Sequence, residues 1–331
     1  MASLLSVQNL SKSFLVSSSR PGAAKQILQA VDDVSFDIEH GETLGLVGES
    51  GCGKSTTGKL VLRLTEPDAG QIYFRDQEIT HRPLRSIIGL RREMQMIFQD
   101  PFSSLNPRMR VGEIIGEPLL IHGIINRSEL LEHVTELLKT VGLSADHYDR
   151  YPHEFSGGQR QRIGIARTLA VKPALIVADE PVSALDLSIQ AQIVNLLQDL
   201  QDQFQLTYLF IAHDLGIIEH ICDRVAVMYL GRIVEIGSAE TIYRHPRHPY
   251  TEALLNAIPI PDPTRKRNHP ILSGEIPSPI NPPTGCHFHP RCPYAKSICK
   301  DEYPGPTQLN EGHVARCHFT QDVGQYRSYG S

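Results

Sequence analysis

The stretch TLGLVGESGCGKSTTGKL, residues 43–60, decides the fold class of this chain. It opens with an apolar run typical of a buried strand, and the residues after Lys54 favour a helix. Between the two, residues 48–55 fit the pattern G-x-x-x-x-G-K-[ST], in which glycines let backbone N–H groups converge on phosphate. A strand, this loop and a helix in succession predict a nucleotide-phosphate site. The alternative, an ordinary glycine-rich turn, explains the glycines but not the lysine and serine.

The side chains of this loop have expected parts in the site. The helix that follows adds positive potential at its amino terminus. Lys54 is expected to reach the β- and γ-phosphates of ATP, and Ser55 to bind Mg²⁺. The residues expected to contact the nucleotide here are Gly48, Glu49, Ser50, Gly51, Cys52, Gly53, Lys54, Ser55 and Thr56.

Outward from this loop the chain alternates strands and helices. Aliphatic runs lie at 43–47, 94–98, 174–179, 207–212 and 225–229, with helical stretches such as 186–205 and 213–221 among them. This alternation predicts an α/β fold with a largely parallel sheet. Segments 4–10, 34–38 and 71–74 are expected to form a smaller antiparallel subdomain, and residues 110–170 an inserted helical subdomain.

The alternating pattern ends near residue 240, because proline becomes frequent from His245 onward. We therefore expect a nucleotide-binding domain over residues 1–240, with the helical subdomain at about 110–170. An irregular carboxyl-terminal extension is expected over residues 241–331.

The stretch ALIVADE, residues 174–180, is an apolar strand that ends in two acids. Sites in parallel sheets form at the carboxyl ends of strands. Asp179 is expected to hold the Mg²⁺ shell, and Glu180 to orient the attacking water and accept its proton. Taken alone, such a pair is more often a solvated strand end or a helix cap. Its place about 125 residues after the phosphate loop favours the catalytic interpretation.

A second helix amino terminus is indicated by FSGGQ, residues 155–159, followed by RQRIGIARTLA. Ser156 and the N–H groups of Gly157 and Gly158 can bind an anionic phosphate, whereas an ordinary helix cap is the plain alternative. Three more features stand at strand ends or turns: Gln99 after MQMIF, SALD at 183–186, and His213 after LFIA. Each alone is typical of a surface or satisfied polar residue.

In this order, the motifs resemble those of ABC transporter ATPases, with Phe155 where Leu is commonest in the signature. The resemblance implies that Gln99 senses Mg²⁺ and water, and that His213 contacts the γ-phosphate. It also implies that Phe14 stacks on adenine, with a core position as the alternative. The implied catalytic residues are Glu180, His213 and Gln99, and the implied Mg²⁺ ligands are Ser55, Gln99 and Asp179.

The same resemblance implies a dimer. The phosphate loop of one chain and the signature of another, here Ser156, Gly157, Gly158 and Gln159, enclose one ATP in such ATPases. Residues 183–186 correspond to the loop that crosses the dimer interface.

Two stretches narrow the family: QDPFSSLNPRM at 99–109 and HPRHPYTEALL at 245–255. Both are similar to ATPases of the oligopeptide, dipeptide and nickel importer family. GEPLLIHG at 116–123 and LSGEIPSPINPPTGC at 272–286 look closer to the F-type partner of the dipeptide system. The resemblance implies an ATP hydrolase that energises import of dipeptides or oligopeptides. Nickel, glutathione or another solute is the alternative within the family, and a non-transport ABC ATPase is the alternative outside it.

The implied partners are a second ABC ATPase subunit in a heterodimer, two transmembrane permease subunits and an extracytoplasmic solute-binding protein. The chain has 32 Lys and Arg against 37 Asp and Glu, a net charge of −5, so no global basic field favours nucleic acid. It shows neither a run of about 18 apolar residues nor a signal-peptide pattern. We expect a peripheral subunit on the cytoplasmic face of the inner membrane.

Four of the six cysteines fall near the carboxyl end, at Cys286, Cys292, Cys299 and Cys317. A structural zinc site favours a tight C-x₂₋₄-C pair, which this spacing lacks, although nearby histidines keep zinc as an alternative. Disulfides are disfavoured in a reducing cytoplasm. Four thiolates suit a [4Fe–4S] cluster, and the resemblance to peptide-importer ATPases with a similar tail implies one. Four unliganded thiols are the remaining alternative.

Overall fold

The computed structural model describes residues 3–16, 25–258 and 275–325. These residues form two compact units, each described by itself below. Unit 1 comprises Met1–Ile38, Thr43–Thr80 and Ala212–Ser331, and unit 2 comprises Glu39–Glu42 and His81–Ile211.

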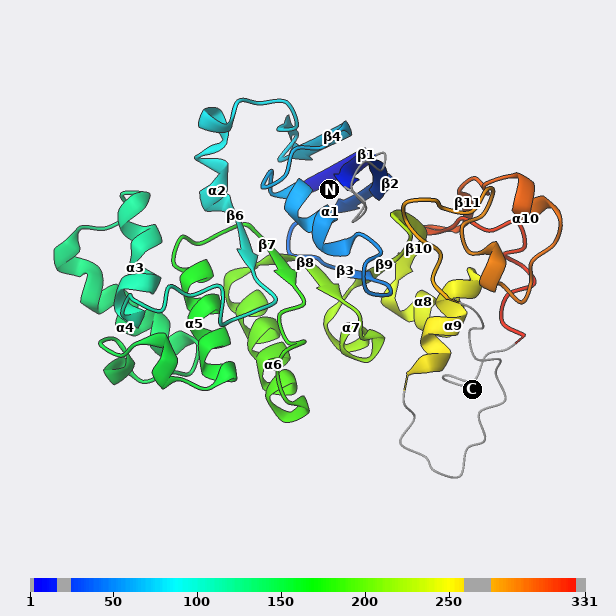
Figure 1. Cartoon of the computed structure of the whole chain (residues 1–331). Helices are drawn as coiled ribbons and strands as arrows, with labels where there is room; N and C mark the ends of the chain where they lie inside the picture. The colour runs from blue at the N-terminus through cyan, green and yellow to red at the C-terminus, as the bar shows by residue number, and fades with distance from the viewer. Residues whose placement is uncertain (1–2, 17–24, 259–274, 326–331) are drawn as a thin grey trace, which may run out of the picture. The chain divides into compact units, whose positions relative to one another are not determined.

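Unit 1 contains an antiparallel sheet with the strand order β2-β1-β4-β5 (Figure 1). The strands are β1 (Leu5–Val16), β2 (Gln26–Ile38), β4 (Ala69–Phe74) and β5 (Gln77–Glu78). Leu5 and Val7 of β1 point to the same face and are buried, as the period of a strand requires. The predicted antiparallel sheet is therefore present, and β1 and β2 run longer than the predicted segments.

The second sheet of unit 1 has the order β3-β9-β10-β12-β11 within that unit. β3 (Thr43–Val47) runs parallel to β9 (Arg224–Tyr229), and the pairs that involve β10 (Arg232–Ser238), β12 (His313–Ala315) and β11 (Thr307–Asn310) are antiparallel. All of β3 is buried, as its apolar run predicts. The helices of this unit are α1 (Lys54–Val61), α7 (Leu215–Ile221), α8 (Ala239–Arg244), α9 (Pro249–Ala257), α10 (Ile298–Asp301) and a 3₁₀ turn at His289–Arg291.

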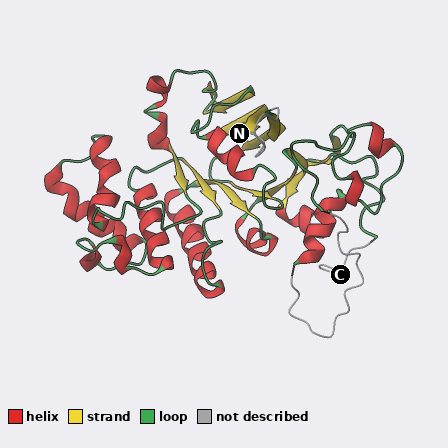
Figure 2. Cartoon of the chain, viewed as in Figure 1, coloured by secondary structure: helices red, strands yellow, loops and turns green. Residues whose placement is uncertain are grey.

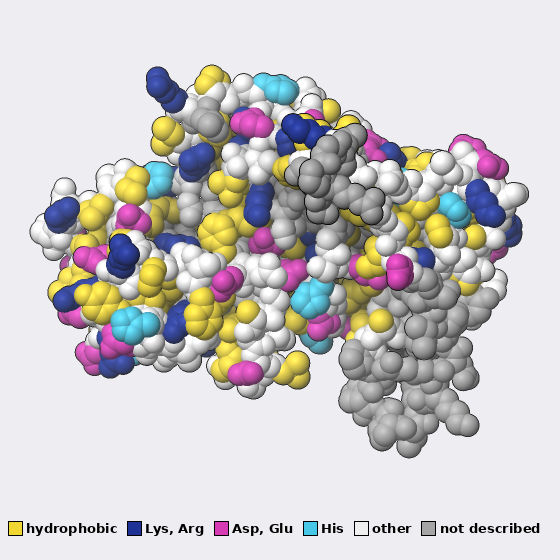
Figure 3. Space-filling view, in the orientation of Figure 1, with side chains coloured by type: hydrophobic (Ala, Val, Ile, Leu, Met, Phe, Trp, Pro, Cys, Tyr) yellow, Lys and Arg dark blue, Asp and Glu magenta, His cyan; other side chains and the backbone are white. Residues whose placement is uncertain are grey.

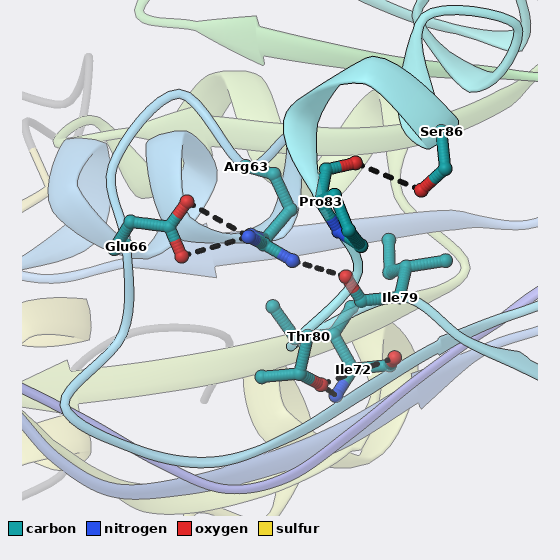
Figure 4. Close-up of polar contacts among 7 residues, drawn as sticks. All are labelled: Arg63, Glu66, Ile72, Ile79, Thr80, Pro83 and Ser86. Atoms are coloured by element: carbon teal, nitrogen blue, oxygen red, sulfur yellow. Dashed lines mark hydrogen bonds and ion pairs between the residues drawn. The ribbon is translucent and has the colours of Figure 1, made fainter.

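Arg63 ties the end of α1 to the antiparallel sheet. Its buried guanidinium donates to both carboxylate oxygens of Glu66, at 2.7 and 2.8 Å, and to the carbonyl oxygen of Ile79 (Figure 4). The next residue, Thr80, accepts through Oγ1 from the N–H of Ile72 on β4 at 2.6 Å. The helix that follows the phosphate loop is thereby fixed at its far end.

The extension is more regular than its proline content predicts. Pro249 is the first residue of α9, where its missing N–H costs no helical hydrogen bond. His248 caps this helix, because its Nδ1 accepts from the N–H of Tyr250 at 3.1 Å. Residues 259–274, in the proline-rich part, lie outside the described residues.

Glu235 of β10 anchors two separate parts of the extension. Its fully buried carboxylate accepts from the N–H of Arg247 at 2.7 Å and from the N–H of His248 at 3.0 Å. Nε2 of buried His313, on β12, lies 2.8 Å from the same carboxylate. A buried carboxylate is costly unless it is surrounded by donors, and here three groups meet it.

Unit 2 contains three parallel strands in the order β8-β7-β6. They are β6 (Met94–Ile97), β7 (Leu175–Asp179) and β8 (Thr207–Ala212), whose last residue falls at the boundary of the unit. The long helix α6 (Leu187–Phe204) joins β7 to β8, which is the connection that parallel neighbours require. The short helices before β6 are α2 (Leu90–Glu93) and a 3₁₀ turn at Leu84–Ile87.

Residues 110–170 of unit 2 form helices and turns. Figure 2 shows α3 (Val111–Ile121), α4 (Leu130–Thr140) and α5 (Gly157–Leu169) as a group of helices without strands in this fully described stretch. Short 3₁₀ turns lie at Arg127–Glu129, Ala145–His147 and Pro152–Glu154. Ile115 of α3, Val134 of α4 and Ile163 of α5 are buried. Arg162 of α5 donates to the carbonyl oxygen of Val141, just after α4, at 2.6 Å.

The surface of the helical subdomain carries charges of both signs. On the face drawn in Figure 3, its basic and acidic side chains are interspersed.

Among the residues that the structure describes, no helix has both the length and the apolarity needed to cross a bilayer.

We predict that Glu235→Ala destabilises unit 1 by about 3 kcal/mol, because it leaves two backbone N–H groups and His313 without their acceptor in the interior. Urea denaturation followed by intrinsic tyrosine fluorescence measures this change. Glu240→Ala is the matched control, since Glu240 and Arg244 form an exposed pair that contributes less than about 1 kcal/mol. Equal denaturation midpoints for the two variants would contradict the anchoring role.

Candidate phosphate site and associated residues

The phosphate loop lies between β3 and α1, as predicted, and its glycines are in strained or crowded positions. Gly48 has a φ of 155° and Gly53 a φ of 107°. A Cβ at Gly48 would lie 2.2 Å from the carbonyl oxygen of Met228, and one at Gly53 would lie 2.1 Å from that of Ala30. Any side chain at either position would therefore displace the backbone of a neighbouring strand.

Lys54 is buried and its ammonium group lies over the loop. Nζ donates to the carbonyl oxygens of Gly48 at 2.8 Å and Glu49 at 3.0 Å. Ser55 and Thr56 follow in the first turn of α1, where the helix amino terminus adds positive potential. The loop therefore presents a cation and a helix end on one short segment, which is the arrangement that binds phosphate.

Glu49 of the loop is held by two residues of the extension. Its N–H donates to Oη of Tyr250 at 2.8 Å. Its carboxylate accepts from Nη1 and Nη2 of Arg291 at 2.8 and 3.0 Å, a bidentate pair. The hydrogen bonds to Glu49 raise the pKa of the Arg291 guanidinium further above its already high value. The sequence did not predict either partner. Tyr250 lies in the stretch 245–255, which indicated only the family, and Arg291 lies in no motif.

Aromatic side chains surround this pair. Tyr229 of β9 lies 4.6 Å from the ring of Tyr250 and 5.3 Å from that of Phe288, between ring centroids. All three are buried, and burial raises the pKa of Tyr250 and Tyr229. The phenol of Tyr250 therefore stays neutral across the physiological range and serves as a hydrogen-bond acceptor for the loop.

His213 and Phe14 lie in unit 1 at exposed positions. His213 directly follows β8 and precedes Asp214, whose side chain caps α7 by accepting from the N–H of Gly216 at 2.8 Å. Phe14 of β1 is 39% exposed, with Nζ of Lys12 5.6 Å from its ring centroid. The ring of Phe14 is thus partly exposed, with the Lys12 ammonium over it.

The acidic pair lies in unit 2 at the carboxyl end of β7, as predicted. Asp179 is buried, and Glu180 adopts a left-handed φ of 46°. The N–H of Glu180 donates to the carbonyl oxygen of Ile211 at 3.0 Å. Nε2 of Gln99 donates to the Glu180 carboxylate at 2.9 Å, so the structure brings these two predicted catalytic residues together. A left-handed non-glycine residue held by its surroundings is a frequent feature of functional sites.

The predicted signature forms the start of α5 in the same unit. Ser156 caps this helix: its Oγ accepts from the N–H of Gln159 at 3.3 Å, and the Gln159 side chain accepts from the N–H of Ser156 at 3.0 Å. A Cβ at Gly158 would lie 2.6 Å from Cγ2 of Ile189, so helix α6 packs directly on the signature glycine. Leu187, just beyond residues 183–186, is 83% exposed.

The four carboxyl-terminal cysteines line one small cavity. Cys286, Cys292, Cys299 and Cys317 share it with His248, Pro249, Phe288, His289, Tyr294, His318 and Phe319. Burial raises the pKa of Cys292 and of Cys317 to about 12. Within the described ranges, no three His, Cys, Asp or Glu side chains are arranged around a common point for a metal ion. The four thiols therefore line the same cavity but do not surround a common point in it.

Comparison with known proteins places these features in a family. Residues 31–183 match the model described as ABC transporter, and residues 234–299 match oligopeptide/dipeptide transporter, C-terminal region. A relative from Brucella ovis is 55% identical over 314 residues, which cover 95% of this chain and 97% of the relative. The oligopeptide transport ATP-binding protein AppF of Bacillus subtilis is 53% identical over 300 residues, or 88% of this chain and 90% of AppF.

Comparison with solved structures indicates the same family. The ATP-binding cassette MJ0796, in a dimeric post-hydrolysis state bound to ADP and Pi, is 26% identical with a TM-score of 0.63, over 71% of this chain and 98% of that one. The chain belongs to the ATP-binding subunits of ABC transporters, within the branch that carries the oligopeptide/dipeptide transporter carboxyl-terminal region. The predicted family and fold class are thus confirmed. ATPases of this family hydrolyse ATP and work with transmembrane permeases.

We predict that Cys292 and Cys317 of metal-free, folded protein react with Ellman's reagent at pH 8 at least about tenfold more slowly than an exposed thiol. Burial raises the pKa of both thiols to about 12, which leaves much less thiolate, and the higher nucleophilicity of such a thiolate offsets only part of the loss. Their rates should still rise with pH beyond pH 10, where an ordinary thiol has levelled off. Denatured protein, with all six cysteines accessible, is the control, and fast native reaction of these two would contradict the burial.

Proposed function

We propose that this chain is the ATP-hydrolysing subunit of an importer for dipeptides or oligopeptides. The match of residues 234–299 to the oligopeptide/dipeptide transporter carboxyl-terminal region carries the proposal, and the similarity to AppF supports it. Nickel, glutathione or another solute is the alternative, since selectivity lies in the permeases and the solute-binding protein. The domain limits of 1–240 and 241–331 remain predictions.

Unit 1 is proposed to bind the nucleotide. Lys54 neutralises the β- and γ-phosphates, and Ser55 ligates Mg²⁺ from the first turn of α1. Phe14 stacks on adenine with its exposed ring, and His213 contacts the γ-phosphate. The rest of residues 48–56 supplies backbone N–H groups.

Unit 2 is proposed to supply the hydrolytic groups. Asp179 and Gln99 complete the Mg²⁺ shell, and Glu180 takes a proton from the attacking water. The hydrogen bond from Gln99 to the Glu180 carboxylate supports this assignment, because it orients the carboxylate at the strand end. Ser156, Gly157, Gly158 and Gln159 act on the ATP of a partner chain.

We propose a heterodimer with a second ABC ATPase, joined to two permease subunits and served by an extracytoplasmic solute-binding protein. Helix α5 begins directly after Ser156, so the N–H groups of Gly157 and Gly158 lie at a helix amino terminus, as a phosphate-binding signature requires. We propose that this chain is the peripheral part of the complex, on the cytoplasmic face of the inner membrane. Nucleic acid is not a proposed partner.

We predict that Glu180→Gln lowers kcat at least about 100-fold in the assembled transporter but keeps ATP affinity and accumulates an ATP-bound dimer, because it removes the proton acceptor alone. Lys54→Ala should instead weaken ATP binding itself. Glu132→Gln, an exposed change on α4, is the matched control. Turnover close to wild type in Glu180→Gln, measured as phosphate release, would overturn the assignment.

A second proposal concerns the cysteine cavity, for which we infer a [4Fe–4S] cluster with zinc as the alternative. One observation supports it: the four thiols line one cavity. Four thiolates are the ligand set of a [4Fe–4S] cluster, and four thiolates also suit zinc. When bound, it supplies a cross-link between segments of the extension, and ATP hydrolysis needs no electrons from it.

The cluster proposal predicts that anaerobically purified protein is brown, with about four irons and four acid-labile sulfides per chain. Cys292→Ser should lose the colour while fluorescent ATP analogues still bind. Cys222→Ser is the matched control, because this buried cysteine lies against Gly45 and not in the cavity, so the colour should stay. Colourless protein with stoichiometric zinc would show that the metal is zinc.

A further inference from the structure

The carboxylate of Glu49 is an unexpected charge for a phosphate-binding loop. Glu49 stands inside the loop, and its carbonyl oxygen is 3.0 Å from the ammonium of Lys54. ATP carries charge of the same sign, so an uncompensated carboxylate here would oppose nucleotide binding. The loop needs a cation close to Glu49 that does not compete for the phosphates.

Arg291 meets this need. Its side chain is 5% exposed and that of Glu49 is 22% exposed, so solvent screens the pair weakly. The guanidinium stays charged at every physiological pH, and its planar fork uses both Nη atoms on the carboxylate. Tyr229 Oη lies 3.5 Å from Nη1, and the ring of Phe288 lies 6.0 Å from the guanidinium carbon. Arg291 therefore uses its charge in the ion pair with Glu49.

Tyr250 fixes the backbone at the same residue. It accepts the N–H of Glu49, so the loop is held at a main-chain and a side-chain group at once. Both partners are distant in sequence: Tyr250 lies 201 residues and Arg291 lies 242 residues beyond Glu49. These contacts all lie within unit 1.

We propose that Arg291 is a positioning residue for ATP binding: it cancels the charge of Glu49 beside the phosphates and, with Tyr250, holds the loop in its phosphate-binding shape. The extension thereby sets the nucleotide affinity of the ATPase. This inference rests on the proposed role of the phosphate loop.

A charge effect on nucleotide affinity differs from a purely structural effect in ways that can be measured. Its size grows with the number of phosphates on the ligand and shrinks as salt screens the charges. It also disappears when both members of the pair are neutralised, because no lone carboxylate is left. A structural defect would weaken all nucleotides alike and would persist in the double variant.

The test uses the full-length chain with Mg²⁺ and titrates the fluorescent analogues mant-ATP, mant-ADP and mant-AMP at low and high salt. Arg291→Gln should weaken mant-ATP binding about tenfold at low salt, mant-ADP less and mant-AMP least. Glu49→Gln should bind mant-ATP about two- to threefold more tightly, and the double variant should recover to within about threefold of wild type. Arg291→Lys, which keeps the charge without the fork, should lose less than Arg291→Gln.

Arg316→Gln is the matched control, since this arginine of the extension pairs with Asp33 of β2 at 3.3 Å, so its nucleotide affinities should match wild type. Equal weakening of the three analogues by Arg291→Gln, no recovery in the double variant, or no effect at all would overturn the inference. If Arg291→Gln does not fold, the comparison of Glu49→Gln, Arg291→Lys and the double variant still decides. Lys54→Ala must weaken mant-ATP binding in the same assay; if it does not, the proposed phosphate site is wrong, whatever Arg291 does.

Discussion

The close packing of the phosphate loop against two neighbouring strands is the constraint on which the rest of unit 1 depends. Gly48 touches the backbone of β9 at Met228, and Gly53 touches that of β2 at Ala30, each at a distance that excludes any Cβ. The loop therefore takes its shape from both sheets of the unit. Lys54 can lie over the loop carbonyls only because that backbone is fixed.

The carboxyl-terminal extension also holds the phosphate loop in place. Glu235 of β10 holds the segment that leads into α9, because it accepts from the N–H groups of Arg247 and His248. His248 in turn caps α9, whose second residue is Tyr250. A chain of hydrogen bonds thus runs from the buried carboxylate of β10 to the N–H of Glu49 in the loop. Removing an early member should disturb the last one, because Glu235, His248 and Tyr250 are buried and bulk water cannot easily replace a lost hydrogen-bond partner.

The sequence predicted what depends on local pattern and missed what depends on long-range pairing. Strand-loop-helix order identified the phosphate loop, and the apolar run before Asp179 placed the acidic pair at a strand end. The pair formed by Glu49 and Arg291 joins two residues 242 positions apart, and neither lies in a periodic segment that would predict its partner. Proline frequency predicted an irregular extension, yet Pro249 begins a helix, because proline is tolerated in the first turn. Composition could not distinguish these two uses of proline.

Three glutamates differ in the groups that surround their carboxylates, and this difference helps to separate a structural role from a chemical one. Glu235 is fully buried and surrounded by donors, so its charge is committed to the fold. Glu49 is partly exposed, and its carboxylate is paired with the guanidinium group of Arg291. The Glu180 carboxylate accepts a hydrogen bond from the amide of Gln99, which is a neutral donor. Of the three, Glu180 is the one for which we propose a chemical role, and it adopts a left-handed conformation directly after strand β7.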